Sequence, residues 1–260
     1  MVSPTYLTAA AFASPQIRHG FFMRKGGLCQ GLQDGLADDL AVAFKPHLNP
    51  TEVQENRRRV EREFGAPFVT AEQVHGTQVL TVTDAWDAHV NPREADGLVT
   101  TQAHLGLGIL TADCAPVLFA DAGSGVIGAC HAGWRGLKAG ILEATVSAMI
   151  DLGARRAQIQ TAVGPLLGRV SYEVGLEFPD HFAGTLAHHR SFFRPAIRRD
   201  RLMFDMPRLI RVMTENLGLQ RPEFIPNDTF TERENFFSHR RATHVGEQNE
   251  GRQISLIALK

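Results

Sequence analysis

The sequence places one cysteine and two histidines where apolar, strand-like segments are expected to end. Cys114 follows "LGLGILTAD", His131 closes "GVIGACH", and His75 closes "PFVTAEQVH". Two histidines and one cysteine form a catalytic zinc set, in which three protein ligands leave one position for water or substrate. We therefore expect these side chains to hold a metal ion that activates water near neutral pH. Zinc is the expected metal, and copper is a possible replacement because Cu(II) binds such ligands more strongly.

The residues next to these candidates indicate which side chains face the site and which face the core. Alternation along a strand points Cys130 and His131 to opposite faces, so Cys130 is expected in the core and His131 at the site. Pro116 cannot donate to a strand ladder, so regular pairing is expected to stop near Cys114 and to leave its thiol accessible. Asp113, beside this thiol, is a candidate proton acceptor, and capping of the turn backbone is its alternative role.

A glycine-spaced segment directly after His131 adds a candidate anion site. "AGWRGLKAG" is expected to be a turn that runs into a helix, with Gly133 and Arg135 at its start. Free backbone N–H groups at a helix start, together with a guanidinium, bind phosphate or developing negative charge. Arg240 and Arg252 are further candidates for the same task. The alternative is that the glycines serve only the geometry of the turn.

The elements that position these residues indicate a mixed α+β fold. Strand-like segments are bunched before His131 instead of alternating with helices, which favours mixed or antiparallel sheets packed between helices. Helices are expected over 49–65, 135–153 and 204–218, the first starting at Thr51 as N-cap with Gln54 in the capping-box position. No repeat or linker divides the chain, so residues 1–260 are expected to form a single domain.

Composition limits the classes of function. Of the 260 residues, 43% are hydrophobic and 21% are charged, and the net charge of -1 gives no electrostatic case for a nucleic-acid or membrane partner. The three cysteines are too few for a disulfide framework, which fits a reducing compartment. No stretch approaches the roughly 18 apolar residues of a membrane span, and the first residues lack a signal-peptide pattern. A cytoplasmic location is therefore expected.

Six motifs, in order along the chain, carry a resemblance to one known family. They are "QVHG", "ADGLVT", "TADCAPVLFAD", "HAGWRG", "GPLLGRVSYEVG" and "FFSHRR…GR". The chain resembles the YfiH/DUF152 family, labelled laccase-domain or polyphenol oxidase proteins and later reassigned as purine nucleoside phosphorylases. The resemblance implies a YfiH-like α+β fold and a zinc ion on His75, Cys114 and His131. It also implies phosphorolysis of adenosine, inosine and methylthioadenosine, with adenosine deamination as a side activity.

Some positions depart from the pattern of that family. The early "R-x-G-G-x-S" motif reads "RKGGLC", so Cys29 replaces a serine, while Arg24 is kept as a further candidate for anion binding. The asparagine-rich turn that follows reads "LADDLAVAF". Asp228 replaces the cysteine of a "CT" pair, and His239 replaces the tyrosine of "FFSYRR". These changes bear on substrate preference and on contacts to the ribose or base, whereas the metal set is intact.

Three other functions fit part of the pattern. Cys114 as nucleophile with His131 as base would make a cysteine hydrolase or amidase, but such a dyad does not require His75. A copper polyphenol oxidase needs His-x-His pairs to bridge its copper cluster, and none of the 11 histidines is two residues from another. A zinc-stabilised binding module would need a closed four-ligand site, for which no fourth ligand stands out. The expected reaction is attack of inorganic phosphate on the ribose of a purine nucleoside, catalysed by a monomer or homodimer.

Overall fold

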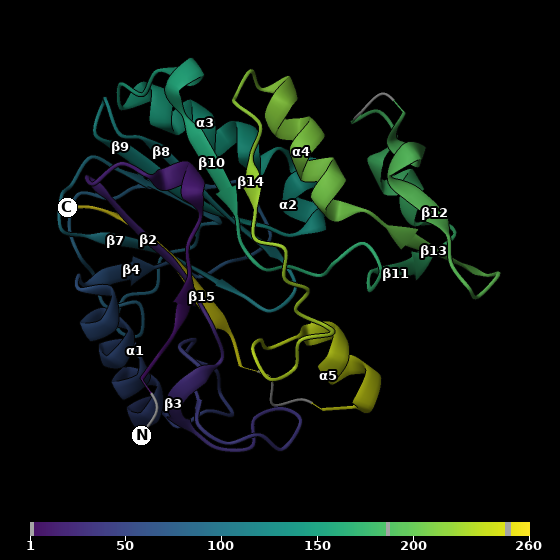
Figure 1. Ribbon diagram of the computed structural model, residues 1–260, viewed down its shortest axis with the longest axis horizontal. Coiled ribbons are helices and arrows are strands. Elements are labelled where there is room, and N and C mark those ends of the chain that lie inside the picture. The colour runs from purple at the N-terminus through teal and green to yellow at the C-terminus, as the bar shows by residue number, and fades with distance from the viewer. Residues whose placement is uncertain (1–2, 186–187, 248–250) are drawn as a thin grey trace.

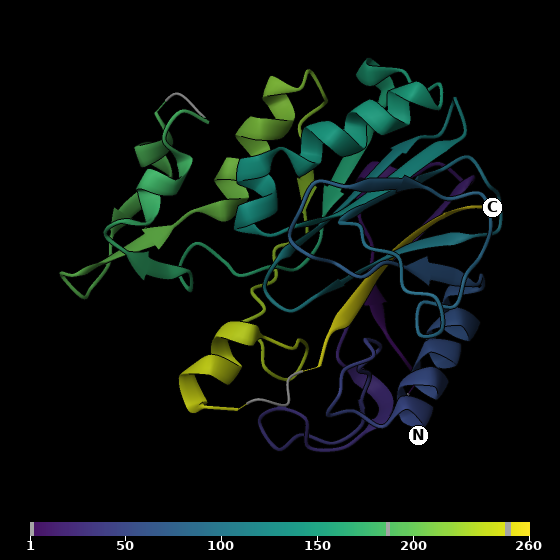
Figure 2. The same cartoon turned by 180° about the vertical axis from the view of Figure 1, so that it is seen from behind.

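Two mixed β-sheets face each other, and helices cover the outer side of both (Figure 1). The computed structural model describes residues 3–185, 188–247 and 251–260. Figure 2 shows the same layers from behind, with helices above the larger sheet and one long helix beneath the smaller one. This confirms the predicted α+β architecture of mixed sheets packed between helices. None of the helices in the described residues has the length and apolar character needed to cross a bilayer.

The five-stranded sheet joins segments from distant parts of the chain. Its pairing is antiparallel except for the parallel pair β4–β7. The strand order is β1 (Tyr6–Leu7), β2 (Ile17–Phe22), β15 (Gln253–Leu259), β7 (Gly106–Thr111) and β4 (Phe68–Thr70). Because β15 lies between β2 and β7, the end of β7 is held beside the residues that precede β15.

The six-stranded sheet is built around a buried hairpin. Its order is β14 (Glu223–Phe224), β10 (Gln160–Val163), β8 (Ala115–Asp121), β9 (Val126–Ala132), β6 (Gly97–Thr100) and β5 (Val79–Thr81). The two outermost pairs are parallel, and the inner pairs are antiparallel. Every residue of β8 and β9 is buried. Strands covered on both faces read as nearly continuous apolar runs, which explains why this part of the sequence lacks polar alternation.

Apolar side chains fill the three interfaces between these layers. The two sheets share a core that includes Leu107, Leu118 and Ile127. On the outer face of the larger sheet pack α2 (Trp134–Ala139), α3 (Ile141–Asp151) and α4 (Met206–Asn216). The helix α1 (Pro50–Phe64) covers the smaller sheet with Val60 and Phe64.

Shorter elements surround the two large sheets. A three-stranded sheet projects to the side of the molecule, with the order β11 (Glu173–Gly175), β13 (Arg201–Phe204) and β12 (Phe193–Pro195) (Figure 1). In the same view the short helix α5 (His239–Val245) lies below this sheet, and the strand β3 (Lys25–Cys29) lies at the lower left, beside α1. Single 3-10 turns occupy Ala10–Phe12, Arg156–Gln158, Phe178–Phe182 and His189–Phe192.

Two predictions about helices are wrong in detail. The helix α1 has Asn49 as its N-cap, with the Asn49 side chain accepting from the Thr51 N–H at 3.0 Å, so Thr51 is not the cap. Pro50 suits the first helical position because its fixed φ matches the helix and its missing N–H is not needed there. The helix expected over 135–153 is interrupted at Gly140, whose φ of 100° ends α2 and starts α3.

Candidate metal centre

The hairpin of β8 and β9 places two of the three predicted ligands at one edge of the larger sheet. Cys114 directly precedes β8, and His131 lies opposite Pro116 near the end of β9. Antiparallel pairing brings the start of one strand beside the end of the next, as the sequence pattern predicted. Regular pairing does break at Cys114, between β7 and β8, but Pro116 is not the cause, because this proline lies inside the ladder of β8. Cys130 is fully buried in the core on the opposite face from His131, as expected.

The third ligand, His75, lies in a turn instead of at a strand end. The strand β4 ends at Thr70, and the backbone of His75 has a φ of 63°. A positive φ in a residue other than glycine is uncommon and needs support from its surroundings. That support comes from Asp96, whose carboxylate accepts the backbone N–H groups of Val74, His75 and Gly76 at 3.1, 3.0 and 2.7 Å.

The three side chains form a compact set of donor atoms. One ligand atom from each of His75, Cys114 and His131 lies within 4.8 Å of the others, and Sγ of Cys114 is 4.0 Å from Nε2 of His75. The two imidazole rings meet edge to face, with centroids 4.7 Å apart. Gly133 closes one side, since a Cβ atom there would lie 3.0 Å from both Sγ of Cys114 and Cδ2 of His75. This soft and borderline donor set, with three protein ligands, fits a catalytic zinc ion.

A carboxylate that the sequence reasoning missed orients one of these ligands. Oδ1 of Asp96 is 2.7 Å from Nδ1 of His131, and Asp96 is fully buried. An imidazole that donates from Nδ1 to a carboxylate keeps Nε2 free for a metal, as in carboxylate–histidine–zinc triads. The "ADG" motif could have indicated this role, because an acidic residue before a buried strand needs a hydrogen-bond partner. The sequence alone does not show which residue that partner is.

The charges of the three side chains favour the form of cysteine that binds metal. Burial raises the pKa of the Cys114 thiol, but the charges and hydrogen bonds of His131 and His75 outweigh burial and lower it to about 6. Burial lowers the pKa of His131, but the Cys114 thiolate and Asp96 outweigh burial and raise it to about 9. At neutral pH a thiolate therefore lies beside an imidazolium. The thiolate is the nucleophilic and metal-binding form of cysteine.

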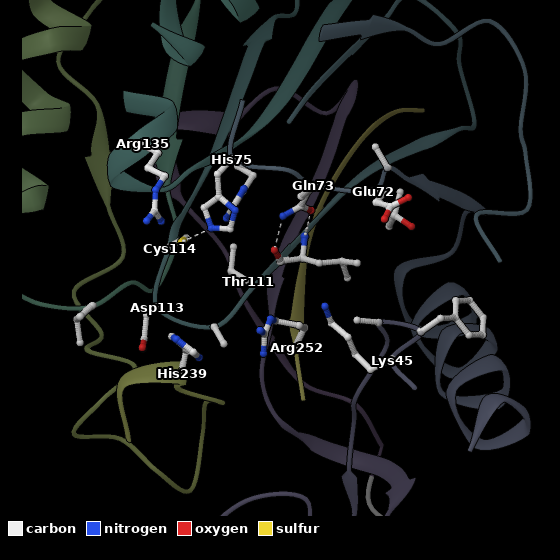
Figure 3. A pocket seen from close by; sticks show the side chains of 18 of the residues that line it. Lys45, Glu72, Gln73, His75, Thr111, Asp113, Cys114, Arg135, His239 and Arg252 are labelled. Atoms are coloured by element: carbon white, nitrogen blue, oxygen red, sulfur yellow. Dashed lines mark hydrogen bonds between the residues drawn. The ribbon is translucent and has the colours of Figure 1, made fainter. Parts of the chain in front are cut away.

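A cavity of about 730 Å³ opens in front of the metal set. Figure 3 shows His75, Cys114 and Arg135 at one end, Thr111 in the middle, and Arg252 and Lys45 farther along. Gln73 closes part of the wall, because its side chain exchanges two hydrogen bonds with the backbone of Leu110 at 2.7 and 2.8 Å. The lining is rich in cationic side chains, namely Lys45, Arg57, Arg135, Arg240 and Arg252.

Arg135 and Arg240, two of the predicted anion-binding residues, both line the cavity, but in different surroundings. Arg135 is exposed, lines the cavity and stacks on Trp134 at 4.5 Å. It belongs to the six-residue helix α2, so the predicted contribution of a long helix does not apply. Arg240 donates to the carbonyl of Glu173 at 2.7 Å and lies over Tyr172 at 5.4 Å. Gly133 has an extended backbone, and its lack of a side chain makes room for the ligands.

Asp113 shapes the cavity wall through its carboxylate. Its Oδ1 accepts a hydrogen bond from the Thr229 hydroxyl, and its Oδ2 accepts one from the backbone N–H of Arg240, both at 2.6 Å. The second bond holds the first turn of α5 against the site, which agrees with the capping role weighed for Asp113. Because Asp113 also lines the cavity, it lies within reach of a bound ligand.

The prediction that Arg24 binds an anion is wrong, because this side chain lies outside the cavity. Arg24 is completely buried and donates to Asp39 at 2.5 and 3.1 Å and to Asp34 at 3.1 Å. Asp34 also accepts from Arg241 of α5 at 2.9 Å. Arg24 therefore anchors α5, and with it Arg240, to the N-terminal part of the chain.

The positions that depart from the family pattern divide into two groups. Cys29 is buried against Asn56, and burial raises its pKa to about 12. Asp228 accepts the Ser171 hydroxyl at 2.6 Å, and neither of these departures lines the cavity. His239 does line it. Of these three replacements, only His239 is placed to contact a ligand in this cavity.

Tyr172 is a further cavity residue that sequence reasoning missed. It lines the cavity, and its ring is held against Phe204 at 5.1 Å. Burial raises the pKa of its hydroxyl, so this group stays protonated and can donate a hydrogen bond to a ligand. The "GRVSYEVG" motif contains this tyrosine, but no spacing rule connects it to the metal set.

The chain is similar to several known proteins. Residues 18–260 match the model of a family described as multi-copper polyphenol oxidoreductase laccase. A purine nucleoside phosphorylase of Pseudomonas aeruginosa is 34% identical over 241 residues, covering 93% of this chain and 95% of that protein. The purine nucleoside phosphorylase YfiH of Escherichia coli is 35% identical over 213 residues, covering 81% and 82%.

Solved structures show the same fold. A Neisseria meningitidis protein described under DUF152 superposes with a TM-score of 0.85 at 28% identity, covering 100% of both chains. The Bacillus licheniformis protein YfiH gives a TM-score of 0.84 at 28% identity, covering 94% of this chain and 93% of that one.

Proposed function

We propose that this chain is a zinc-dependent purine nucleoside phosphorylase. The chain belongs to the family described as multi-copper polyphenol oxidoreductase laccase. Its relatives include proteins named purine nucleoside phosphorylase. Its substrates are adenosine, inosine and methylthioadenosine together with inorganic phosphate, and adenosine deamination is a side activity. We expect a cytoplasmic monomer or homodimer.

One observation supports this proposal above the others. A three-ligand metal set opens onto a cavity lined by several cationic side chains and a protonated tyrosine. An open metal position suits catalysis, whereas a structural zinc site is closed by four ligands. Cationic side chains suit phosphate, which is the second substrate of a phosphorylase.

His75, Cys114 and His131 would hold the zinc ion, which when bound supplies a Lewis acid to the cavity. Arg135 and Arg240 bind the phosphate and orient it. A phosphate oxygen forms a bond to the anomeric carbon of the ribose while the bond from this carbon to the purine nitrogen breaks. The purine leaves with the electron pair and takes up a proton. Tyr172 is placed to donate a hydrogen bond to the substrate.

The reaction is tested by incubating inosine with the zinc-loaded protein, with and without inorganic phosphate. Hypoxanthine and ribose 1-phosphate are expected only when phosphate is present. Release of hypoxanthine and free ribose without phosphate would instead indicate a hydrolase.

A cysteine hydrolase is the second candidate, because the Cys114 thiolate lies beside the His131 imidazolium. His75 disfavours it, since a Cys–His dyad leaves this third ligand without a task. Turnover of an amide substrate by metal-free protein, and its loss on alkylation of Cys114, would decide for the hydrolase.

A copper polyphenol oxidase is disfavoured, because the described residues offer one group of three metal-binding side chains and no multi-copper cluster.

A further inference from the structure

A buried arginine from α1 lines the cavity. Arg57 is 7% exposed and donates to the carbonyl of Val42 at 3.1 Å and to the hydroxyl of Thr70 at 3.4 Å. Its guanidinium lies over the rings of Phe68 and Phe44 at 4.5 and 5.6 Å. These contacts hold the guanidinium in one place, but they supply no negative charge.

The charge of Arg57 has no counter-ion among the residues that the structure describes. None of their carboxylates forms an ion pair with it, and its hydrogen bonds to them use two of its five N–H donors. The charges of Glu61 and Asp87 act on it only at longer range. Burial lowers the pKa of Arg57 to about 10, so it stays charged at neutral pH. A buried cation of this kind is costly, and negative charge on a ligand would relieve the cost.

Arg57 lies at the end of the cavity remote from the metal set. The carbonyl of Val42, to which it donates, belongs to the residue whose backbone N–H bonds to the carbonyl of Arg252 at 3.4 Å. Figure 3 shows Arg252 on the side of Thr111 away from Cys114. The order along the cavity is therefore the metal set, then Thr111, then Arg57.

An unsatisfied hydroxyl lies between the two ends. Thr111 is 1% exposed, lines the cavity, and its Oγ1 has no hydrogen-bond partner among the described residues. A buried hydroxyl normally finds a partner, and a ligand in the cavity would supply one. The hydroxyl can both donate and accept, so it fits either kind of polar atom on a purine base.

The proposed reaction places phosphate and purine at opposite ends of this cavity. Phosphate, bound by Arg135 and Arg240 near the metal set, approaches the anomeric carbon from the side opposite the bond that breaks. The purine therefore extends away from Arg135, past Thr111 and towards Arg57. Negative charge develops on the purine as its bond to the ribose breaks, so Arg57 gains its counter-charge in the transition state.

We infer that Arg57 is a catalytic residue that stabilises the leaving purine anion by hydrogen bonds to its O6 and N7 atoms, with Thr111 as a second partner of the same base. This inference rests on the proposed function. An oxygen of hydrogen phosphate forms a bond to the anomeric carbon, and the electron pair of the broken carbon–nitrogen bond passes into the purine ring. The purine anion then takes up the proton that the phosphate loses, which gives hypoxanthine and ribose 1-phosphate. Arginine binds O6 and N7 of guanine with the same two-donor geometry.

Kinetics of the zinc-loaded protein with inosine and 7-methylinosine test this inference. The base of 7-methylinosine carries a positive charge, so it leaves as a neutral molecule and needs no cation to stabilise it. Arg57→Gln should lower kcat for inosine by about 100-fold, the usual effect of losing one donor to a developing anion, and kcat for 7-methylinosine by less than about threefold. The KM for phosphate should not change. Arg58→Gln, exposed on the same helix and outside the cavity, is the matched control and should change neither rate.

Two conservative variants keep the test independent of effects on folding, which circular dichroism checks. Arg57→Lys keeps the charge but loses the two-donor geometry, so it should restore inosine turnover only in part. Thr111→Val removes only the hydroxyl, and it should raise the KM for inosine several-fold without lowering the melting temperature. Thr161→Val is its matched control, because Thr161 is equally buried and its Oγ1 also lacks a partner among the described residues, but it lies outside the cavity.

Equal losses for inosine and 7-methylinosine in Arg57→Gln would overturn the inference. A raised KM for phosphate as the sole effect would also overturn it, because Arg57 would then bind phosphate instead of the purine. Unchanged inosine kinetics in Thr111→Val would remove Thr111 from the base subsite. Failure of the proposed function is distinguishable, since the wild-type protein would then release no hypoxanthine from inosine and phosphate.

Discussion

Asp96 joins His75 and His131 through a single carboxylate. Its Oδ1 is 2.7 Å from Nδ1 of His131, and the same carboxylate accepts three backbone N–H groups of the turn that carries His75. Burial raises the pKa of Asp96, but the hydrogen bonds from His131 and the turn outweigh burial and lower it. Asp96 therefore fixes both the ring of one ligand and the backbone of another.

Asp96→Asn is expected to lower zinc affinity by about 10–100-fold, the usual effect of losing a carboxylate behind a histidine ligand. Competitive titration with a chelator measures this change. Asp121→Asn is the matched control, because Asp121 is also buried but bonds to Ser124 and Arg155 instead of a predicted metal ligand. Similar zinc affinities in the two variants would contradict the prediction that Asp96 positions the zinc ligands.

Removing a ligand should remove the metal without unfolding the chain. Cys114→Ala and His131→Ala are expected to lose zinc, which purified wild-type protein should carry at about one ion per chain. Elemental analysis measures the metal, and circular dichroism checks the fold. Cys130→Ala is the control, because Cys130 adjoins His131 but faces the core. Full zinc occupancy in both ligand variants would contradict the assignment of the site.

Arg135→Ala is expected to raise the KM for phosphate and to lower turnover. The loss of transition-state stabilisation should be roughly 1.5–3 kcal/mol, the contribution of a charge-assisted hydrogen bond. Zinc content should not change. Arg135→Lys should restore activity only in part, because an ammonium cannot make a two-pronged contact. Lys138→Ala, on the same short helix but outside the cavity, is the control. Unchanged phosphate kinetics would leave the task to Arg240 or Arg252.

The free energy of unfolding should depend on pH through the Asp121 carboxyl. Burial raises the pKa of this carboxyl, but hydrogen bonds from Arg155 and Ser124 outweigh burial and lower it to about 2. A lowered folded-state pKa adds stability above the unfolded value of 3.8, and this stability is lost as the pH falls towards 2. Asp121→Asn should therefore cost about 1–2 kcal/mol at pH 7. Urea unfolding should show the difference from wild type shrinking between pH 4 and about 2. A constant difference would contradict the shift.

The meeting of Cys114 and His131 could be predicted from the sequence because chemistry and strand patterns agree there. Cys114 and His131 lie at the ends of adjacent apolar strands, and alternation correctly separates His131 from Cys130. The turn of His75 could not be predicted, because its positive φ depends on a carboxylate from another segment. Asp96 was missed for the same reason, since its role exists only once distant segments meet.

The cationic side chains were harder to assign. An arginine in a motif does not show whether it faces a ligand or an internal carboxylate, and Arg24 proved to do the latter. The glutamates around Arg57 are typical of a solvated helix face, yet Arg57 is buried in the cavity wall. Its position follows from the packing of Phe44 and Phe68, which no local pattern encodes.

The central place of β15 sets an order of assembly. The hairpin of β8 and β9 pairs residues that are close in sequence, so Cys114 and His131 can meet early in folding. The pairs that β2 and the end of β7 make with β15, by contrast, need a segment that follows both at a long distance along the chain. Thr111 and Arg252 come together only at that step. A folding intermediate with paired β8 and β9 would hold two metal ligands before the substrate cavity has closed.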